Sequence, residues 1–584
     1  MVVCPGSRSA AIAAAVADSN LDGHAIYDER SAAFFALGLS RVNRRPTALI
    51  CTSGTAGAHF YPALIEASMS GIPLVVITAD RPIEAQNAGA SQTIDQTHMF
   101  GRHVRSYVDI GNPCADARGQ RAAWNKLCRA IAISRGPIPG PVHINAPFRK
   151  PILAPTPLIE SMANIHQPVP MPVCGPEVID DMTTAIASAE RPVIVCGPSA
   201  PEPSPPLSET TTIPHTFSQR AIFMLAQIAR MPVLAEATSQ LRFVAASNDS
   251  NPIAIIEHFD EIFRRSLSSD LIPDLIIECG TPPTSSGYAR FLENHDNSPI
   301  KRIAIRPLRY QDPSHNATQV VVGPIGSIVT QLCESMTSHP QTKKPITNAM
   351  ADSREAFRQR WRMMNAAINH AASLAAESAE PKSSGQAAIQ AIVANLPAGT
   401  QLVIGNSLAI RWLNAMPSRP HASSHKTPVP LALSVYSQRG AAGIDGMIAS
   451  AAGIALASQR PTCLIIGDVS AAHDLGSLAL TNPISTPLII CVLDNRGGQI
   501  FSELPYAKYL PQKTLNKFFT TPPNVNFGAA AAAFGVTTTI TDTLTSLATT
   551  ITAATQHNGA TLIRIPIQTR SRPVLSTPQQ GSSA

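Results

Sequence analysis

An acid and an amide follow two apolar segments that are neighbours along the chain. Asp468 comes directly after PTCLIIG, and Asn495, 27 residues further on, comes after TPLIICVLD. Both segments are typical of buried parallel strands, and neighbouring parallel strands place their carboxyl ends side by side. A carboxylate and an amide oxygen facing one cleft suit Mg²⁺, which takes its remaining ligands from phosphates and water. Either residue alone would be a helix N-cap or a turn residue, but their spacing favours a metal and phosphate site.

A second acid precedes a helical segment near the N-terminus. The stretch HAIY (24–27) has an extended pattern, and Asp28 and Glu29 follow it at the start of the helical run SAAFFALGLS. We expect Asp28 to be the helix N-cap. Glu29 alone would be a first-turn acid that the helix dipole stabilises. Together with the site at Asp468, it becomes a candidate for activating a bound cofactor.

Glycine turns and arginines stand at several other predicted strand ends. PGSRS (5–9) and TSGTAG (52–57) each lead from a strand into a helix, and such turns expose helix N-termini that bind anions. Four arginines also lie near strand ends, namely Arg8, Arg81, Arg411 and Arg439. Each alone would be a surface charge, but the guanidinium group is a two-pronged donor to carboxylates. Together they predict a substrate with several carboxylates.

The composition is that of a globular protein with large buried sheets. Only 14% of the 584 residues are charged and 44% are hydrophobic, against roughly 25% charged in typical domains. The net charge of +6 is not concentrated in a Lys/Arg block, so no nucleic-acid interface is expected. No apolar run reaches the ~20 residues that cross a bilayer, so no membrane span is expected. The ten cysteines form no C-x-x-C pair, which favours a reducing, cytoplasmic location.

Short apolar runs alternate with Ala-rich helical stretches along the whole chain. This rhythm predicts an α/β protein with doubly wound parallel sheets. Seams rich in Pro and polar residues divide it into three such domains, at 1–155, 170–345 and 383–570, with a tail at 571–584. We expect linkers at 155–175 and 335–355. The expected strands are 2–4, 47–52, 73–79 and 141–147, then 191–197, 232–237, 273–280, 301–307 and 318–323, and finally 401–407, 461–468, 486–495 and 560–566.

The spacing of Asp468 and Asn495 resembles the metal- and diphosphate-binding signature of thiamine-diphosphate enzymes. Further motifs extend the resemblance to one family, the SEPHCHC (2-succinyl-5-enolpyruvyl-6-hydroxy-3-cyclohexene-1-carboxylate) synthases of menaquinone biosynthesis, called MenD. In chain order these motifs are PGSRS, YDER, TSGTA, YPALIEA, TADRP, VHINAPF, GNS, RGAAGIDG, GDVSAAHDL and NRGGQIFSELP. They cover most of the first and third domains, whereas the second domain is similar only in general form.

The resemblance implies a transferase that depends on thiamine diphosphate and Mg²⁺, with Mn²⁺ as an alternative metal. Similar enzymes decarboxylate 2-oxoglutarate and add the resulting succinyl carbanion equivalent to isochorismate in a 1,4-addition, releasing CO₂. The resemblance also implies pyrimidine-binding, central and diphosphate-binding domains in that order, with the first domain shorter at its N-terminus than is usual. The site would lie between two chains of a homodimer or homotetramer.

The resemblance also assigns roles to single residues. Glu29 would activate the cofactor ring, and Glu29, Arg411 and Arg439 are the expected catalytic residues. The metal would be held by Asp468, Asn495 and Gly497. The expected cofactor-binding residues are Glu29, Ile444, Gly467, Asp468, Val469, Ser470, Asn495, Gly497, Gln499 and Ile500. The expected substrate-binding residues are Ser7, Arg8, Arg81, Gln92, Ser407, Arg411, Arg439, Phe501 and Leu504.

Two other functions stay open at this point. A different thiamine-diphosphate 2-oxoacid decarboxylase, or an acetolactate-synthase-like enzyme, would use the same cofactor residues. A pyruvate-sized substrate, however, would not need Arg411 and Arg439. An inactive paralogue would be expected to lack Glu29 or Asp468, and both are present.

Overall fold

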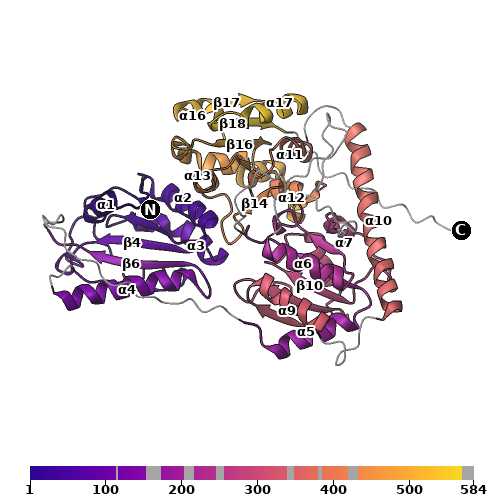
Figure 1. Ribbon diagram of the computed structural model, residues 1–584. Coiled ribbons are helices and arrows are strands. Elements are labelled where there is room, and N and C mark those ends of the chain that lie inside the picture. Colours follow the sequence, from indigo (N-terminus) through magenta and orange to yellow (C-terminus); the bar gives the residue numbers. More distant parts are fainter. Residues whose placement is uncertain are drawn as a thin grey trace.

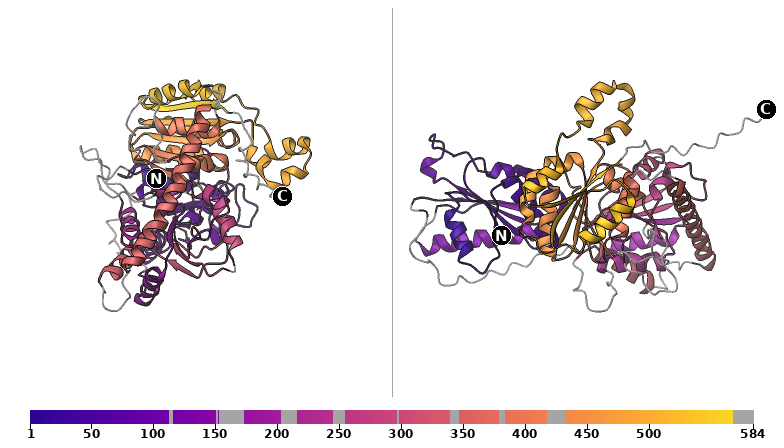
Figure 2. Two further views of the ribbon diagram at one scale, coloured as in Figure 1. Left: turned by 90° about the vertical axis from the view of Figure 1, so that its right-hand side faces the viewer. Right: turned by 90° about the horizontal axis from the view of Figure 1, so that it is seen from above.

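The chain folds into three parallel β-sheets, each of six strands and each covered by helices (Figure 1). The computed structural model describes residues 1–112, 116–150, 152, 173–202, 216–244, 255–296, 298–338, 347–378, 384–417 and 432–567. Viewed from above, the third sheet lies between the first and the second (Figure 2). The predicted α/β fold with three doubly wound parallel sheets is confirmed.

The first sheet has the strand order β2-β1-β3-β4-β6-β5. Its strands are β1 (Val2–Val3), β2 (His24–Ala25), β3 (Thr47–Cys51), β4 (Leu74–Asp80), β5 (Tyr107–Asp109) and β6 (Pro141–Pro147). Its helices are α1 (Ala10–Ala17), α2 (Glu29–Asn43), α3 (Tyr61–Ser70) and α4 (Ala117–Arg135). The central strands β4 and β6 are almost wholly buried, as expected of parallel strands that are covered on both faces.

The third sheet repeats this strand order, as β14-β13-β15-β16-β18-β17. Its strands are β13 (Gln401–Ile404), β14 (Ser434–Ser437), β15 (Thr462–Gly467), β16 (Pro487–Asp494), β17 (Thr537–Ile540) and β18 (Gly559–Pro566). Its helices are α11 (Gly385–Ala394), α12 (Leu408–Ala415), α13 (Met447–Ser458), α14 (Asp468–His473), α16 (Phe527–Ala533) and α17 (Leu544–Ala554). The order therefore reverses between β1 and β3 and, equivalently, between β13 and β15. Ligands bind beyond the carboxyl ends of the strands at such reversals.

The second sheet has a different order, β12-β11-β10-β7-β8-β9. Its strands are β7 (Pro192–Cys196), β8 (Val233–Ala235), β9 (Ile255–Ile256), β10 (Leu275–Cys279), β11 (Lys301–Arg306) and β12 (Gln319–Val322). Its helices are α5 (Pro176–Ser188), α6 (Phe217–Ile228), α7 (Phe259–Arg264), α8 (Ser286–Asn294) and α9 (Ile325–Ser338). This order reverses between β7 and β10. The loops that follow these two strands are hydrogen-bonded to each other, because Thr281 N donates to Pro198 O over 3.0 Å.

The long helix α10 (Asn348–Ser378) runs along the outside of the second sheet (Figure 1). Its Trp361 is fully buried in an apolar cluster with residues of this sheet. Its buried Arg354 donates to the carbonyls of Ala189 and Ala229, just beyond the C-termini of α5 and α6, where carbonyls lack partners within the helix. The linker expected at 335–355 is therefore wrong for its described residues, because α9 and α10 are helical there and α10 is packed.

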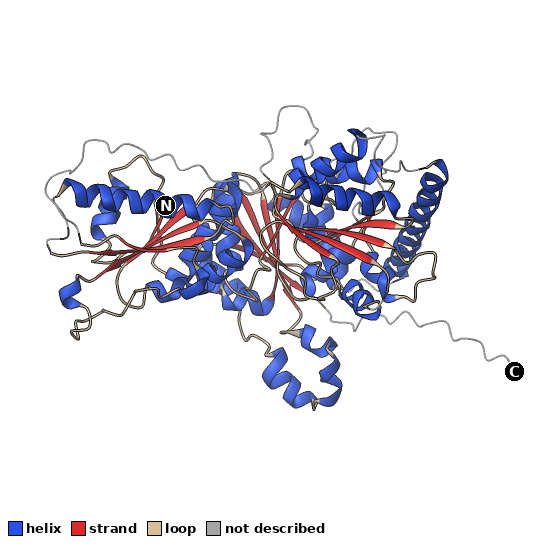
Figure 3. Cartoon of the chain, turned by 90° about the horizontal axis from the view of Figure 1, so that it is seen from below, coloured by secondary structure: helices blue, strands red, loops and turns tan. Residues whose placement is uncertain are grey.

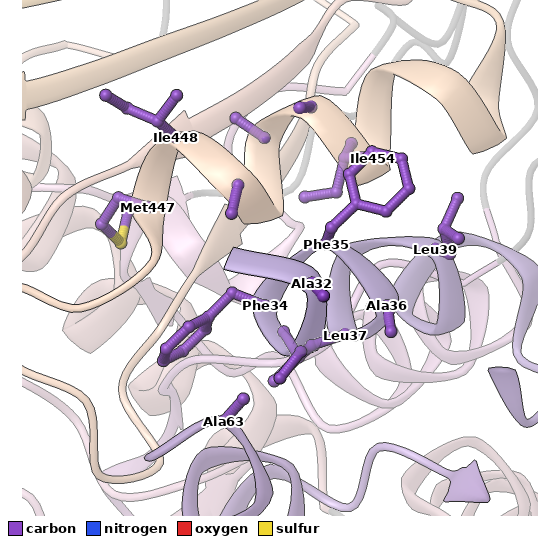
Figure 4. Packing of buried hydrophobic residues seen from close by; sticks show 14 of the residues in the cluster. Ala32, Phe34, Phe35, Ala36, Leu37, Leu39, Ala63, Met447, Ile448 and Ile454 are labelled. Carbon is purple, nitrogen blue, oxygen red and sulfur yellow. The ribbon is translucent and has the colours of Figure 1, made fainter. Parts of the chain in front are cut away.

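The first and third domains share one apolar core, which forms where α2 crosses α13. Figure 4 shows Phe35 and Leu39 of α2 beside Ile454 of α13. The two helices cross so closely at Gly38 that a Cβ there would lie 2.3 Å from Ser450 O. Both helices are buried along most of their length, as expected of helices that are apolar on all sides.

The strands predicted from apolar runs agree with the structure to within a few residues. The five strands that these runs do not predict, β2, β5, β9, β14 and β17, all lie at sheet edges, although β2 falls within the extended pattern expected at 24–27. The expected tail at 571–584, and residues 155–172 of the expected linker, lie outside the described residues. None of the described helices is both long and apolar enough to cross a membrane. The nine cysteines in the described part of the chain are free thiols.

A helical excursion between β16 and α16 projects from the third domain (Figures 2 and 3). It consists of the short helices η6 (Gln499–Glu503), η7 (Pro505–Tyr509), α15 (Gln512–Leu515) and η8 (Asn516–Thr520). The aromatic rings of Phe501 and Tyr506 pack on Phe519. The side chains of Tyr509 and Phe518 are exposed.

Candidate cofactor and substrate site

Asp468 is the first residue of α14 and lies at the carboxyl end of β15, as the sequence predicts. Its side chain is only 1% exposed. Oδ1 accepts from Val469 N over 2.8 Å, and Oδ2 accepts from Gly497 N over 2.7 Å. The second bond links the end of β15 to the turn after β16, so the two predicted halves of the metal site are in contact.

The turn after β16 depends on two residues with a positive φ. Arg496 has φ 61° and Gly497 has φ 110°. A side chain at Gly497 is excluded, because its Cβ would lie 2.1 Å from Thr520 O. Asn495 therefore follows the strand at the edge of a tight turn. The Gly497 carbonyl accepts from Gln499 N over 2.8 Å, which leaves its second lone pair for a further partner.

The electrostatic surroundings of Asp468 favour a cation. The pKa of Asp468 is raised to about 6, chiefly by burial and also by the neighbouring Asp494, although its backbone hydrogen bonds act against this rise. Asp494 itself is paired with Arg564 over 2.6 Å. In the described part of the chain Asp468 forms no ion pair. A buried carboxylate with a second carboxylate nearby and no cationic partner fits a divalent metal ion.

The space beside Gly467, at the end of β15, is open. A Cβ placed on Gly467 would meet no atom within 4 Å. Val469 and Ser470 form the first turn of α14 beside this space. The described residues contain no cluster of three His, Cys, Asp or Glu side chains that could hold a metal alone. The predicted donors, one acid, one amide and a backbone carbonyl, would leave positions for outside oxygen ligands, which is a set that Mg²⁺ tolerates.

Glu29 begins α2, and its neighbour Asp28 caps that helix by accepting from Ser31 N over 3.1 Å. The prediction that Asp28 is the N-cap is thus confirmed. Glu29 is half-buried. Its carboxylate lies near the thiols of Cys4 and Cys51, and after burial its charge is a further cause that raises the pKa of each. Glu29 therefore stands at the carboxyl ends of β1 and β3, where the order of the first sheet reverses.

Arg8, Arg81 and Gln92 gather around the same sheet edge. Arg8 is buried and donates to Phe148 O over 2.9 Å. Burial, and then the like charge of Arg81, lower the pKa of the Arg8 guanidinium. Arg81 donates to the backbone of the loop that contains Gln92, and Gln92 Nε2 donates to Ser53 O over 3.1 Å. In the described ranges neither arginine is paired with a carboxylate, so the pair can receive an anion.

Ser7 is exposed in the turn after β1, next to Arg8. It lies within PGSR, in which a Cβ on Gly6 would clash with the Thr52 side chain at 2.3 Å. This close approach brings the turns after β1 and β3 together. The expected members of the first-domain set, Ser7, Arg8, Arg81, Gln92 and Glu29, are therefore all at the carboxyl edge of one sheet.

Ser407, Arg411 and Arg439 occupy the corresponding edge of the third sheet. Ser407 has φ 65° at the start of α12, a strained conformation for serine of the kind that persists where surrounding contacts impose it. Arg411 Nη1 donates to Ser407 O over 2.6 Å, and Arg439 Nη1 donates to Asn406 Oδ1 over 3.3 Å. Both arginines therefore flank the end of β13.

The remaining predicted residues are apolar and partly exposed. Ile444 is 37% exposed in the loop between β14 and α13. Ile500, Phe501 and Leu504 lie at the base of the helical excursion, directly after the turn at Gly497, and Leu504 is 36% exposed. Gln499 Nε2 donates to Arg496 O over 3.2 Å and stabilises that turn. Exposed apolar groups next to the predicted cation site could form the wall of a ligand pocket.

The structure places the predicted residues in two groups within one chain. The first-domain group surrounds Glu29 and Arg8, and the third-domain group surrounds Asp468 and Arg439. Among the described residues, no hydrogen bond or ion pair joins a predicted residue of one group to a predicted residue of the other.

Sequence reasoning did not identify three polar residues that contact these groups. Asn406 Nδ2 donates to Gln438 O over 2.8 Å and to Ala442 O over 2.9 Å. Glu66 and Glu236 are buried acids next to the loop that carries Arg439. The sequence could have indicated Glu66 and Glu236 as buried acids, because each stands within an apolar segment, YPALIEA and PVLAEA respectively.

Comparison with known proteins identifies the family. A family model described as the N-terminal TPP binding domain of thiamine pyrophosphate enzymes matches residues 1–99, and the corresponding C-terminal TPP binding domain matches residues 425–565. Over 96% of its length the chain is 36% identical to the 2-succinyl-5-enolpyruvyl-6-hydroxy-3-cyclohexene-1-carboxylate synthase of Sorangium cellulosum (strain So ce56), of which 89% is covered. The chain belongs to this synthase family.

Another member of the synthase family, from Geobacillus kaustophilus (strain HTA426), is 34% identical over 91% of the chain and 86% of its own length. The crystal structure of benzoylformate decarboxylase from Polynucleobacter necessarius is similar in fold, with a TM-score of 0.65 at 15% identity over 98% of this chain and 96% of that one. The predicted membership of the synthase family and the thiamine-diphosphate-enzyme fold are confirmed.

Proposed function

We propose that the chain is a SEPHCHC synthase that removes CO₂ from 2-oxoglutarate and adds the remaining four-carbon unit to isochorismate. Membership of the synthase family supports the reaction. The observation that carries the proposal is the geometry of the third domain, in which the Asp468–Gly497 contact lies in the same sheet edge as Arg411 and Arg439. The first feature fits a metal-bound diphosphate, and the second fits a substrate with a distal carboxylate.

Thiamine diphosphate, when bound, supplies a carbon nucleophile that can hold the electron pair left by decarboxylation. Asp468, Asn495 and the Gly497 carbonyl would hold Mg²⁺, or Mn²⁺ in its place, together with the diphosphate. Gly467, Val469, Ser470, Gln499 and Ile500 would line the cofactor site. Glu29 would accept a hydrogen bond from the pyrimidine ring and stabilise its basic form. Ile444 would contact the cofactor as an apolar wedge.

The two arginine sets would separate the two substrates. Ser407, Arg411 and Arg439 would bind the distal carboxylate of 2-oxoglutarate. Ser7, Arg8, Arg81 and Gln92 would bind isochorismate, which is also an anion. Ile500, Phe501 and Leu504 would exclude water, and a dry site strengthens the contacts that stabilise developing charge.

We propose further that the site is completed between chains, in a homodimer or homotetramer. Similarity to the synthase family supports this arrangement, in which Glu29 of one chain and Asp468 of another would serve one cofactor. A cytoplasmic location is proposed on the basis of the free, mostly buried cysteines, which are typical of a reducing compartment.

The test is an absorbance assay of isochorismate consumption with purified protein, Mg²⁺, thiamine diphosphate and 2-oxoglutarate. We expect consumption only when all components are present, its loss with EDTA, and its recovery with Mg²⁺ or Mn²⁺. Glu29→Gln should lower the rate by about 10²-fold or more.

The matched control is Asp28→Asn, which changes the neighbouring acid in the same way but keeps a side chain that can cap α2. It should keep most of the activity. Release of CO₂ from 2-oxoglutarate without consumption of isochorismate would contradict the synthase assignment and support a simpler decarboxylase. Equal losses in both variants would contradict the role of Glu29.

A further inference from the structure

The loop between β14 and α13 (438–446) carries two residues of the proposed site. Arg439 lies at one end of this loop and Ile444 near the other. Such a loop is free to move unless its backbone polar groups find fixed partners. The contacts that hold this loop therefore determine how precisely Arg439 and Ile444 are placed.

Glu66 of α3, in the first domain, is a fixed partner of this loop. Its carboxylate is fully buried. Oε2 accepts from Ala441 N over 2.6 Å and from Ala442 N over 2.9 Å. Oε1 accepts from Gly440 N over 3.1 Å. Three consecutive backbone N–H groups therefore converge on one carboxylate from another domain, as in the anion-binding nests of polypeptide backbone.

The carboxylate is in turn held by its own domain. Arg41 Nη2 donates to Glu66 Oε1 over 3.0 Å, and Ser70 Oγ donates to the same oxygen over 2.8 Å. Arg41 also donates to Ser437 O over 2.8 Å, just before the loop. A Cβ on Gly440 would lie 2.5 Å from Ser70 Oγ, so the loop approaches α3 as closely as glycine allows.

The other side of the loop is fixed within the third domain. Asn406 donates to the Gln438 and Ala442 carbonyls, and Gln438 Nε2 donates to Asp445 O over 2.8 Å. Asn406 also accepts from Arg439. The N–H groups of the loop thus face the first domain, and its carbonyls face the strand end that carries Ser407.

We propose that Glu66 is a positioning residue that sets Arg439 for the distal carboxylate of 2-oxoglutarate. This rests on the proposed function. Glu66 touches neither substrate nor cofactor, and acts by fixing the backbone next to Arg439. The first domain thereby determines the acid specificity of a site on the third domain.

Glu66→Gln tests the proposal, because an amide has only one acceptor oxygen and in either orientation leaves at least one of the three loop N–H groups without its acceptor. Ser70→Ala is the matched control, because it removes one bond to the same carboxylate and leaves the three loop bonds intact. The first readout is hydrogen–deuterium exchange of peptides covering 438–446 in the full chain loaded with thiamine diphosphate and Mg²⁺. Loss of charged hydrogen bonds should speed exchange by about tenfold or more in Glu66→Gln but not in Ser70→Ala.

The second readout is the ratio of kcat/KM for 2-oxoglutarate to that for 2-oxobutanoate, which lacks the distal carboxylate. This ratio should fall by about tenfold in Glu66→Gln and stay unchanged in Ser70→Ala. In an Arg439→Ala background the same substitution should change it little, because residues that act through one contact are not additive. If Glu66→Gln does not fold, Glu66→Asp, which keeps the charge opposite Arg41, should change both readouts in the same direction.

Unchanged exchange, or an unchanged ratio with faster exchange, would overturn the proposal. So would equal effects in Ser70→Ala, which would show that Glu66 only stabilises the domain contact. If the unaltered protein fails to use 2-oxoglutarate, the proposed function fails, and the exchange measurement still decides whether Glu66 holds the loop.

Discussion

Replacing Glu236 with Gln should stabilise the protein at alkaline pH. Glu236 follows β8 in the second domain and is 1% exposed. Its Oε1 accepts from Thr284 N over 2.6 Å and from Thr284 Oγ1 over 2.7 Å. In the described part of the chain its Oε2 has no hydrogen-bond partner. Glutamine keeps the oxygen that Thr284 needs and removes the buried negative charge.

The size of the effect follows from the pKa of Glu236. Burial raises this pKa from 4.5 to about 7, although the Thr284 hydrogen bonds and the positive charge of Arg439 act against it. Between these two values the folded state binds more protons than the unfolded state, so stability falls as pH rises from 4.5 to about 7. A shift of this size corresponds to about 3 kcal/mol of lost stability above the upper value.

The assay is urea unfolding of the unaltered protein and of Glu236→Gln at about pH 5 and about pH 8. The variant should be more stable by up to about 3 kcal/mol at the higher pH and nearly equal at the lower. Comparing the two proteins at each pH cancels other raised carboxyls such as Asp474, whose pKa burial raises to about 6.

Glu278→Gln is a matched contrast, because this buried glutamate pairs with Arg302 and Arg306. It should destabilise the protein by about 3–5 kcal/mol at both pH values, since it leaves buried positive charge uncompensated. If Glu236→Gln gives no gain at the higher pH, or the same gain at both, the buried charge of Glu236 does not destabilise the folded protein as expected.

Two further substitutions test the packing and the cofactor space. Gly453→Ala should lower the melting temperature by several degrees, because its Cβ would lie 2.3 Å from Phe35 O and force α2 and α13 apart. The control Gly528→Ala in α16 should leave the melting temperature unchanged, because the nearest atom to its Cβ would lie 3.5 Å away. Equal melting temperatures of the two variants would contradict the close crossing. Gly467→Ala should leave the melting temperature of the cofactor-free protein unchanged and weaken thiamine diphosphate binding in calorimetry by about tenfold or more, whereas unchanged affinity would show that the diphosphate lies elsewhere.

Interior strands were predicted better than edge strands, of which only β12 (Gln319–Val322) was among the predicted apolar runs. Interior strands such as β4, β15 and β16 are continuous apolar runs because helices cover both faces, and their predicted bounds agree closely with the structure. Edge strands have a neighbour on one side only. The edge strand β17, TTTI, is largely exposed, so it has no apolar run to read. Helix α10 was missed because its apolar positions face a sheet that lies far away in the sequence.

The site shows the same division between local and distant information. The contact between Asp468 and Gly497 was predictable, because both residues end neighbouring strands and a tight turn limits where the second can lie. The contact between Glu66 and Ala441 joins residues 375 positions apart in different domains. No local pattern encodes such a pairing, although a buried acid must find donors somewhere.

The surroundings of Arg439 join all three domains. Its own domain supplies Asn406, which accepts from its guanidinium. The first domain supplies Glu66, which binds the backbone beside it, and the second supplies the buried charge of Glu236. A change in how any domain packs would therefore alter the position or the field of this one arginine. This gives the second domain, which contributes no residue to the proposed site, a physical route to influence the binding of 2-oxoglutarate.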